Sequence, residues 1–132
     1  MKNFVLSPKM LSLGGVFYPK GYAVIMFPDA EDARQVATAF AGQSEDIMLL
    51  TPEDVMGQIG QMEDHNADIA LPGVGTESAT VRKYIDLARD GDHALMVAVD
   101  SDETAEALMK LVRERPFSYA QRYHLLAIED LE

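Results

Sequence analysis

Four side chains near the carboxyl end of the chain have the chemical character of a binding site. They are Tyr119, Arg122, Tyr123 and His124, which bring aromatic, cationic and titratable groups into one short segment. We predict that this segment is a β-strand, and the side chains that share one of its faces are candidates for lining a pocket beside the sheet. The interpretation that we favour is an edge strand whose polar side chains protect the sheet from further pairing.

The three histidines do not have the spacing of a metal site. His65, His93 and His124 lack both the i, i+4 spacing and the close spacing that zinc ligands show in sequence. His93 and His124 are moreover expected on strands that have another strand between them. There is no cysteine, no serine in a nucleophile elbow and no carboxylate pair spaced for acid–base catalysis, so we predict no metal, no cofactor and no catalytic residue.

Two acidic turns have the character of helix starts. Residues 100–103 resemble the beginning of a calcium loop, but the glycine and the closing glutamate of such a loop are absent. Residues 29–32 are similarly acidic, and the helix dipole stabilises carboxylates in the first turn of a helix. Both turns are therefore interpreted as helix caps. Residues 73–78 faintly resemble a phosphate loop but lack its lysine, and they are interpreted as a turn between helices.

The two acidic turns belong to a pattern that occurs twice. In each copy an apolar run, residues 24–27 or 95–99, leads into the turn and then into apolar residues at i, i+3, i+4 and i+7, the spacing of one buried helix face. The two faces are Ala33, Val36, Ala37 and Phe40, and Ala105, Leu108, Met109 and Val112. Aligning Val24 with Met96 matches both faces position for position, so the pattern predicts a fold with pseudo-twofold symmetry.

The remaining elements complete the order βαβ, helical insert, βαβ. We expect a second strand at residues 47–50, helices of the insert within about residues 52–90, and a last strand from near Phe117 to Ile128. The first helix of the insert is predicted to start with Thr51 as its cap and Pro52 in its first turn, and its apolar face is Val55, Ile59 and Met62. A further helix is predicted to open at Thr76, with an apolar face of Val81, Tyr84, Ile85 and Ala88. The predicted fold class is α+β: a ferredoxin-like βαβ-(helical insert)-βαβ sandwich with an antiparallel sheet in the order 4-1-3-2 and its helices on one face. Residues 21–132 would form this single domain, and residues 1–20 an N-terminal arm with a hairpin.

The two central strands are apolar at successive positions, so both of their faces are expected to be buried. The face without helices would have to be covered by residues 1–20, by the insert or by a second subunit. An exposed apolar patch of several hundred Å² is uncommon on a monomer, whereas two packed sheets would bury about 1,200–2,000 Å². We therefore expect a homodimer that packs through the sheet face.

The charge balance excludes several classes of partner. The chain of 132 residues has 22 acidic against 11 basic residues, and its net charge of −11 repels the phosphates of nucleic acids and the anionic lipids of a membrane. No apolar run approaches the ~20 residues of a membrane-spanning helix, and the first residues do not form a signal peptide. We expect a cytoplasmic protein that binds neither nucleic acid nor membrane.

Three stretches resemble the small ferredoxin-like domain of the bacterial general stress, or heat-induced stress, protein family. They are GYAVIMFPDAEDA from Gly21, YIDLARDGDHALMVAVDSDETAEAL from Tyr84 and RYHLLAIEDL from Arg122, and the resemblance covers about residues 21–132. Members of that family often carry a central apolar segment rich in glycine and alanine, whereas residues 52–78 here are acidic and polar with only a short PGVG. The resemblance implies the fold and a stress-related binding role, and it supplies no catalytic residues.

Two functions remain open from the sequence. The first, which we favour, is a non-enzymatic regulatory or protein-interaction module, because catalytic motifs are absent and the central strands are apolar on both sides. The second is a small-molecule-binding protein or cofactor-free enzyme with a pocket between the sheet and the helical insert. Its polar contacts would be Tyr119, Arg122, Tyr123 and His124, and domains of this predicted fold support both functions.

Overall fold

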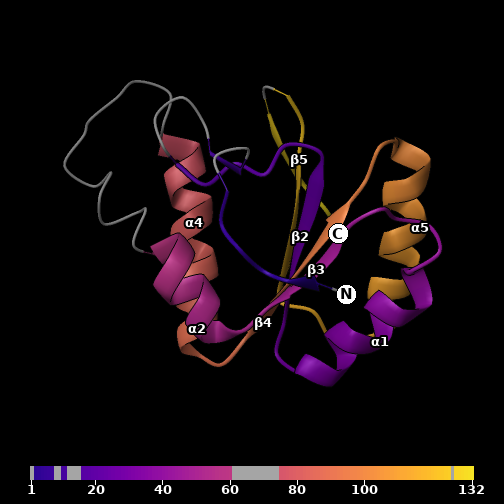
Figure 1. Ribbon diagram of the computed structural model, residues 1–132, viewed down its shortest axis with the longest axis horizontal. Helices are drawn as coiled ribbons and strands as arrows, with labels where there is room; N and C mark the ends of the chain where they lie inside the picture. Colours follow the sequence, from indigo (N-terminus) through magenta and orange to yellow (C-terminus); the bar gives the residue numbers. More distant parts are fainter. Residues whose placement is uncertain (1, 8–9, 12–15, 61–74, 126) are drawn as a thin grey trace.

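A sheet of six strands, in the order β1-β3-β4-β2-β5-β6, lies at the centre of the molecule (Figure 1). The computed structural model describes residues 2–7, 10–11, 16–60, 75–125 and 127–132. Along the chain the elements are β1 (Lys2–Asn3), β2 (Tyr22–Phe27), α1 (Ala30–Phe40), β3 (Ile47–Leu50), α2 (Pro52–Asp54), η2 (Val55–Ile59), α4 (Gly75–Arg89), β4 (His93–Ala98), α5 (Asp102–Val112), β5 (Tyr119–Tyr123) and β6 (Ile128–Asp130). The predicted α+β class is confirmed.

The four inner strands pair antiparallel with one another. β2 pairs with β4 on one side and with β5 on the other, and β3 pairs with the far side of β4. The four strands therefore lie in the order β5-β2-β4-β3, which is the order predicted from the repeat. At the edges, β1 is added parallel to β3 and β6 is added antiparallel to β5.

The two repeats match in detail. The offset that aligns Val24 with Met96 also aligns the first and last residues of α1 with those of α5. Each helix begins with a side-chain cap, in which Asp29 or Ser101 accepts a hydrogen bond from a backbone N–H of the first turn. Every residue of the two predicted apolar faces is buried. The helix faces and the capping role of both acidic turns are therefore confirmed.

α1 and α5 pack next to each other on one face of the sheet (Figure 1). Every second side chain of a strand points to this face. Ala23, Ile25 and Phe27 of β2 and Leu95 and Val97 of β4 form one core cluster with the buried faces of the two helices. Burial of each large apolar side chain contributes roughly 1.5–3 kcal/mol, so this cluster is a major part of the core.

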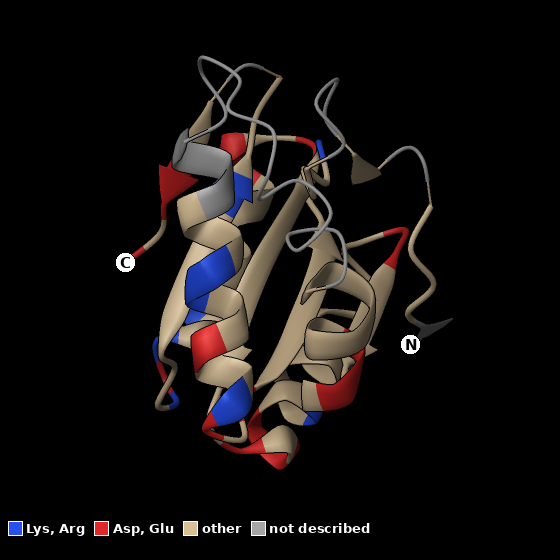
Figure 2. Cartoon of the chain, turned by 90° about the vertical axis from the view of Figure 1, so that its left-hand side faces the viewer, with Lys and Arg blue, Asp and Glu red and all other residues tan. Residues whose placement is uncertain are grey.

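The opposite face of the sheet is covered by the chain itself. A second core cluster lies there, to which η2, α4 and the described residues of the N-terminal segment contribute. It contains Phe4, Met10, Val16, Phe17, Tyr18, Val24, Met26, Val55, Ile59, Val81, Tyr84, Ala88 and Met96. Figure 2 views the molecule from this side, with α4 in front of the sheet. The prediction that the helices lie on one face is therefore wrong. A homodimer packed through the sheet face is not supported either, because no open face is left there.

The hairpin expected at the end of the N-terminal arm, between residues 15–18 and 22–27, is not formed by the described residues 16–18. β4 and β5 occupy both sides of β2, which leaves no position in the sheet for residues 16–18. Phe17 instead forms an isolated antiparallel bridge with Leu11, and its ring is buried. A turn does precede β2, and Gly21 adopts a φ of +82° there, a conformation that glycine tolerates without strain.

The insert begins as predicted and then departs from a regular α-helix. Thr51 and Asp54 make the two reciprocal hydrogen bonds of a capping box, and Pro52 follows the cap. After this single turn the helix widens into the π-helix η2. Val55 and Ile59 of η2 are buried, so two positions of the predicted apolar face do point to the core.

The rest of the insert is described from α4 onward. Met62, His65 and residues 73–74 of the turn predicted at residues 73–78 lie outside the described residues. The rest of that prediction is wrong, because residues 75–78 already belong to α4. The predicted apolar face of α4 is confirmed, because Val81, Tyr84 and Ala88 are buried and Ile85 is partly buried. The chain leaves this helix through Gly91, whose φ is +102°.

The predicted last strand is in fact two strands. β5 ends at Tyr123, and the chain then reverses so that the His124 N–H donates to the carbonyl oxygen of Ala127 over 2.8 Å. β6 returns antiparallel beside β5. The reversal contains neither glycine nor proline, so the usual sequence signal of a turn is missing. The consequence is that β6, and not β5, forms this edge of the sheet.

Candidate functional site

The four residues predicted to share a pocket lie on two different faces of the sheet. Side chains alternate along β5, and Ala120 belongs to the cluster under α1 and α5 while Tyr123 belongs to the opposite cluster. Tyr119 and Tyr123 therefore point toward α4. Arg122 and His124 lie on the α5 side, where they line one groove. The structure thus brings together two of the four residues and separates the other two from them.

The two tyrosines belong to packed aromatic contacts and not to an open pocket. Tyr123 is 1% exposed, and its hydroxyl oxygen lies 2.8 Å from that of Tyr84. The Tyr123 ring meets the rings of Phe17 and Tyr18 edge to face, and Tyr119 meets Tyr84 in the same way. Burial, together with the neighbouring Tyr123, raises the pKa of Tyr84 well above its ordinary value, so the Tyr84 hydroxyl remains protonated at neutral pH.

A groove of about 710 Å³ lies between α5 and the β5–β6 hairpin. We call it the α5 groove. Its apolar lining residues are Ala105, Met109 and Leu131, and its charged or titratable lining residues are Asp102, Glu106, Arg113, Arg122, His124, Glu129, Asp130 and Glu132. The groove therefore combines a small apolar surface with a dense set of charges.

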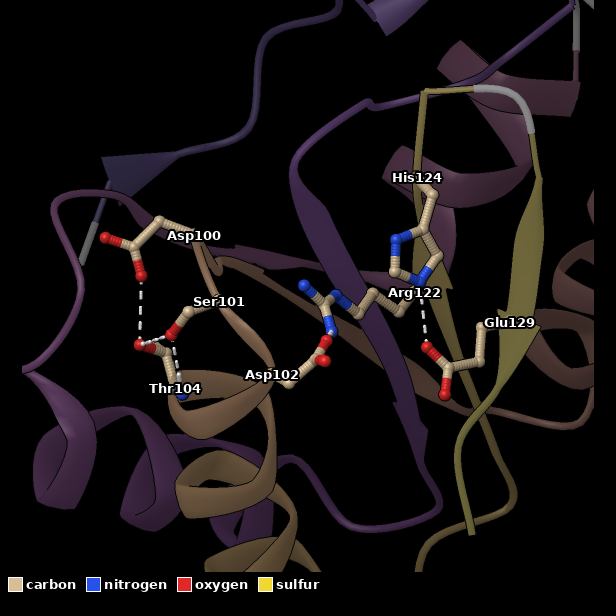
Figure 3. A network of polar contacts seen from close by, with 7 residues as sticks. All are labelled: Asp100, Ser101, Asp102, Thr104, Arg122, His124 and Glu129. Carbon is tan, nitrogen blue, oxygen red and sulfur yellow. Dashed lines mark hydrogen bonds and ion pairs between the residues drawn. The ribbon is translucent and has the colours of Figure 1, made fainter.

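Arg122 reaches across the groove to α5. Its Nη1 atom lies 2.7 Å from Oδ1 of Asp102, in the first turn of the helix (Figure 3). The side chain of Arg122 is only 11% exposed, whereas that of Asp102 is 96% exposed. A largely buried guanidinium is costly without a counter-charge. The exposed carboxylate of Asp102 supplies that charge and ties the strand to the helix.

His124 and Glu129 connect the two strands of the hairpin. Nε2 of His124 lies 2.8 Å from Oε1 of Glu129, and both side chains are partly exposed (Figure 3). Glu129 stands directly opposite Arg122 in the β5–β6 register, so its side chain lies on the α5 side of the hairpin. The contact is a hydrogen bond when the imidazole is neutral and an ion pair when it is protonated.

Arg113 closes the other end of the charged lining. Its Nη1 and Nη2 atoms lie 2.8 and 3.4 Å from the two carboxylate oxygens of Glu106, and its Nε–H donates to the main-chain oxygen of Glu132 over 2.6 Å. The hydrogen bond from Arg113 lowers the pKa of Glu106. The last residues of the chain are therefore linked to α5 through this arginine.

The charged side chains along the groove are held in position by one another. The lining residues include no serine, threonine, cysteine or lysine that could act as a nucleophile. Each arginine has a carboxylate partner, and His124 has Glu129. Among the residues that the structure describes, no three histidine, cysteine or acidic side chains gather as a metal site. The groove lining is therefore dominated by paired charges.

The α5 side of the groove was missed from the sequence. Asp102 and Glu106 are one helical turn apart and share a face of α5, which is a readable pattern. Asp102 was assigned only a role in starting the helix, since no partner charge was known to lie opposite. Glu129 was missed because the chain reversal before β6 carries no turn signal.

Comparisons of the chain with protein-family models, with curated proteins and with solved structures found no match. No helix in the described ranges is both long enough and apolar enough to cross a membrane. Function must therefore be argued from the geometry of the molecule.

Proposed function

We propose that this chain is a non-enzymatic regulatory module that binds a partner protein through the α5 groove. The observation that carries the proposal is the set of ion pairs that hold the charged side chains along the groove, Arg122 with Asp102 and Arg113 with Glu106. Such pairs determine where each charge stands before a partner arrives. Charge complementarity at an interface gives specificity and fast association, and it requires no chemical step.

A small-molecule site between the sheet and the insert has less support. That region holds Tyr123 and Tyr84 in mutual contact, and both rings are buried among other core side chains. A small molecule in the α5 groove is the competing occupant. We propose binding rather than catalysis for either occupant, because the charged groups of the groove are engaged in ion pairs with one another.

We also propose that the domain is ferredoxin-like and stress-related. The order β5-β2-β4-β3, with α1 and α5 on one face, supports the ferredoxin-like core. η2, α4 and the N-terminal residues Phe4, Met10 and Val16 to Tyr18 are additions that cover its second face. The stress-related role rests on the resemblance of residues 21–132 to the bacterial general stress family, which is an analogy at the level of the fold.

Site-specific photo-crosslinking tests the protein-binding function. A crosslinking side chain is placed at position 106 or 129, on the two sides of the groove, in cells that produce the protein. A matched control places it at Glu53, which is exposed on α2. We expect both groove positions to capture the same protein and position 53 not to capture it. The captured protein is then purified, and its affinity for the unmodified chain is measured.

A small molecule bound in the α5 groove, the competing occupant, would be recognised by a different experiment. Native mass spectrometry of the chain purified from the same cells would detect a retained small molecule. A small molecule that is lost from the Arg122→Met variant, together with no protein captured at positions 106 and 129, contradicts the proposed function.

A further inference from the structure

The outer edge of β6 has backbone groups available for pairing. On the inner side, the Leu131 N–H donates to the carbonyl oxygen of Ala120 over 3.0 Å, and the carbonyl of Ala127 accepts from His124. Hydrogen-bonding residues alternate along an antiparallel strand. Residues 127, 129 and 131 therefore face β5, and the N–H and C=O groups of Ile128 and Asp130 point outward, where the described part of the sheet ends.

A strand added at this edge would place every second side chain over the α5 groove. Glu129 shares its face with Arg122, on the side of α5. Side chains of neighbouring strands that stand opposite each other share a face. Alternate residues of the added strand would therefore lie beside Glu129 and opposite the carboxylates that α5 contributes, those of Asp102 and Glu106.

The charges of the groove select the side chains of that strand. Four acidic side chains, Asp102, Glu106, Glu129 and Glu132, line the groove together with two arginines. The carboxylate of Asp130 lies on the opposite face of the hairpin, where it accepts a hydrogen bond from Gln121. Each arginine is already paired with a carboxylate. Because the lining is net acidic and the whole chain carries −11, lysine or arginine side chains are attracted and acidic ones are repelled.

A second copy of this chain fits the edge poorly. Two β6 strands paired with each other would bring the carboxylates of Glu129 and Asp130 close to those of the other copy. Like charges placed opposite each other in a sheet are destabilising. The same acidic residues thus act against self-pairing while they favour a basic strand.

We propose that the free edge of β6 accepts an extended basic segment of the partner protein as an added β-strand, whose alternate lysine or arginine side chains lie over the α5 groove. This inference rests on the proposed protein-binding function and specifies the chemistry of the partner. Main-chain hydrogen bonds supply affinity in such strand addition, and the alternate side chains supply specificity.

Three synthetic peptides and the full chain test the proposal. The first peptide alternates lysine and valine over about eight residues, the length of an ordinary strand. The second replaces every lysine by glutamate. The third keeps the lysines but carries N-methyl groups on alternate backbone nitrogens, which removes donors without changing charge. Fluorescence anisotropy should show binding of the first peptide alone, with the N-methylated peptide at least about tenfold weaker.

Two variants of the chain locate the binding. Glu129→Lys reverses a charge beside the edge, and Glu53→Lys makes the same change on exposed α2. We expect Glu129→Lys to weaken the binding of the lysine peptide about tenfold and Glu53→Lys to have little effect on it. Hydrogen exchange at the amides of Ile128 and Asp130 should slow when the peptide is bound. Thermal melts of both variants check that each remains folded.

The proposal is overturned if the N-methylated peptide binds as tightly as the first, or if Glu53→Lys weakens binding as much as Glu129→Lys. Either result would mean that the peptide adsorbs through net charge alone. The proposed function itself would survive if crosslinking at positions 106 and 129 still captured one protein. If the crosslinking experiment also captured no protein, both the proposed function and the strand addition would be contradicted.

Discussion

Val24 and Met96 face each other across the central strand pair of the sheet. They are also the positions that the alignment of the two repeats makes equivalent. Two equivalent strands that pair antiparallel run in opposite directions, so only one residue of the first strand can face the equivalent residue of the second. That pair of residues lies at the twofold axis that relates the repeats. The pseudo-twofold axis therefore passes between Val24 and Met96.

Truncating a side chain at the centre of either buried helix face should lower the free energy of unfolding. Leu108 is fully buried in α5, and Val36 occupies the equivalent position in α1. We expect Leu108→Ala to reduce the free energy of unfolding by about 2–5 kcal/mol and Val36→Ala to reduce it by less, because fewer atoms are lost. Exposed Lys110→Ala is the control, and equal losses for Leu108→Ala and Lys110→Ala in denaturant melts would contradict the buried face.

The hydroxyl pair of Tyr84 and Tyr123 predicts a non-additive pair of substitutions. Either single change to phenylalanine leaves a buried hydroxyl without this partner, at a cost of about 1–3 kcal/mol. The double variant removes both hydroxyls and should cost clearly less than the two single losses together. Chemical denaturation of the four proteins measures the coupling, and additive losses would show that the two hydroxyls act independently.

Alkaline pH should destabilise the fold through its tyrosines. Burial, and then the hydrogen bond to Asp46, raise the pKa of Tyr22 from 10.0 to about 12. Below about pH 10 the Tyr22 hydroxyl is protonated in both the folded and the unfolded chain, so its full contribution to the free energy of unfolding is present. As pH rises from about 10 toward 12 the unfolded chain ionises first, so stability falls. Denaturant melts across this range should show a smaller fall for Tyr22→Phe, and an equal fall would exclude this cause.

The ion pair between Arg122 and Asp102 should respond unequally to loss of each partner. Asp102→Ala leaves the nearly buried guanidinium without this counter-charge, at a cost of roughly 1 kcal/mol or more. Arg122→Met puts an apolar side chain of similar length in the enclosed position and should cost less, because buried ion pairs are often replaceable by apolar packing. Glu103→Ala, at the neighbouring exposed position, controls for the loss of an acidic residue from the first turn. The opposite ranking of Asp102→Ala and Arg122→Met would contradict this account.

Removing residues 1–14 should expose the second core cluster. Phe4 and Met10 are buried in that cluster, where Phe4 meets Phe17 edge to face. We expect light scattering to show association of the shortened chain at concentrations where the full chain stays monodisperse. A full chain that is already dimeric, and that remains an unchanged dimer after the deletion, would show that these residues are not the cover.

The sequence predicted the parts of the fold that follow from local pattern. The repeated helix faces, the caps at Asp29 and Ser101 and the capping box at Thr51 depend on residues within one or two turns, and all were found. The cover of the second face was not predicted correctly, because Phe17 and Tyr84 meet only in three dimensions. Their apolar character fitted a buried site but did not specify which element would lie on which face.

Two of the four predicted site residues line the α5 groove. Arg122 and His124 were identified from their chemical character, but Tyr119 and Tyr123 were grouped with them although strand alternation already places neighbours on opposite faces. Asp102 could not be paired with Arg122 from spacing, since the contact depends on how α5 crosses β5. That crossing is a property of the packed sheet.

The order of the strands has a consequence for how the molecule is made. β2 and β3 belong to the first repeat, yet β4 lies between them. A nascent chain that has emerged only through residue 60 therefore has two strands that cannot pair with each other. The sheet must wait for β4, and then for β5, so nearly the whole polypeptide has to be synthesised before its core can close. Such dependence on distant segments slows folding and makes a half-length fragment of this chain an unfolded one.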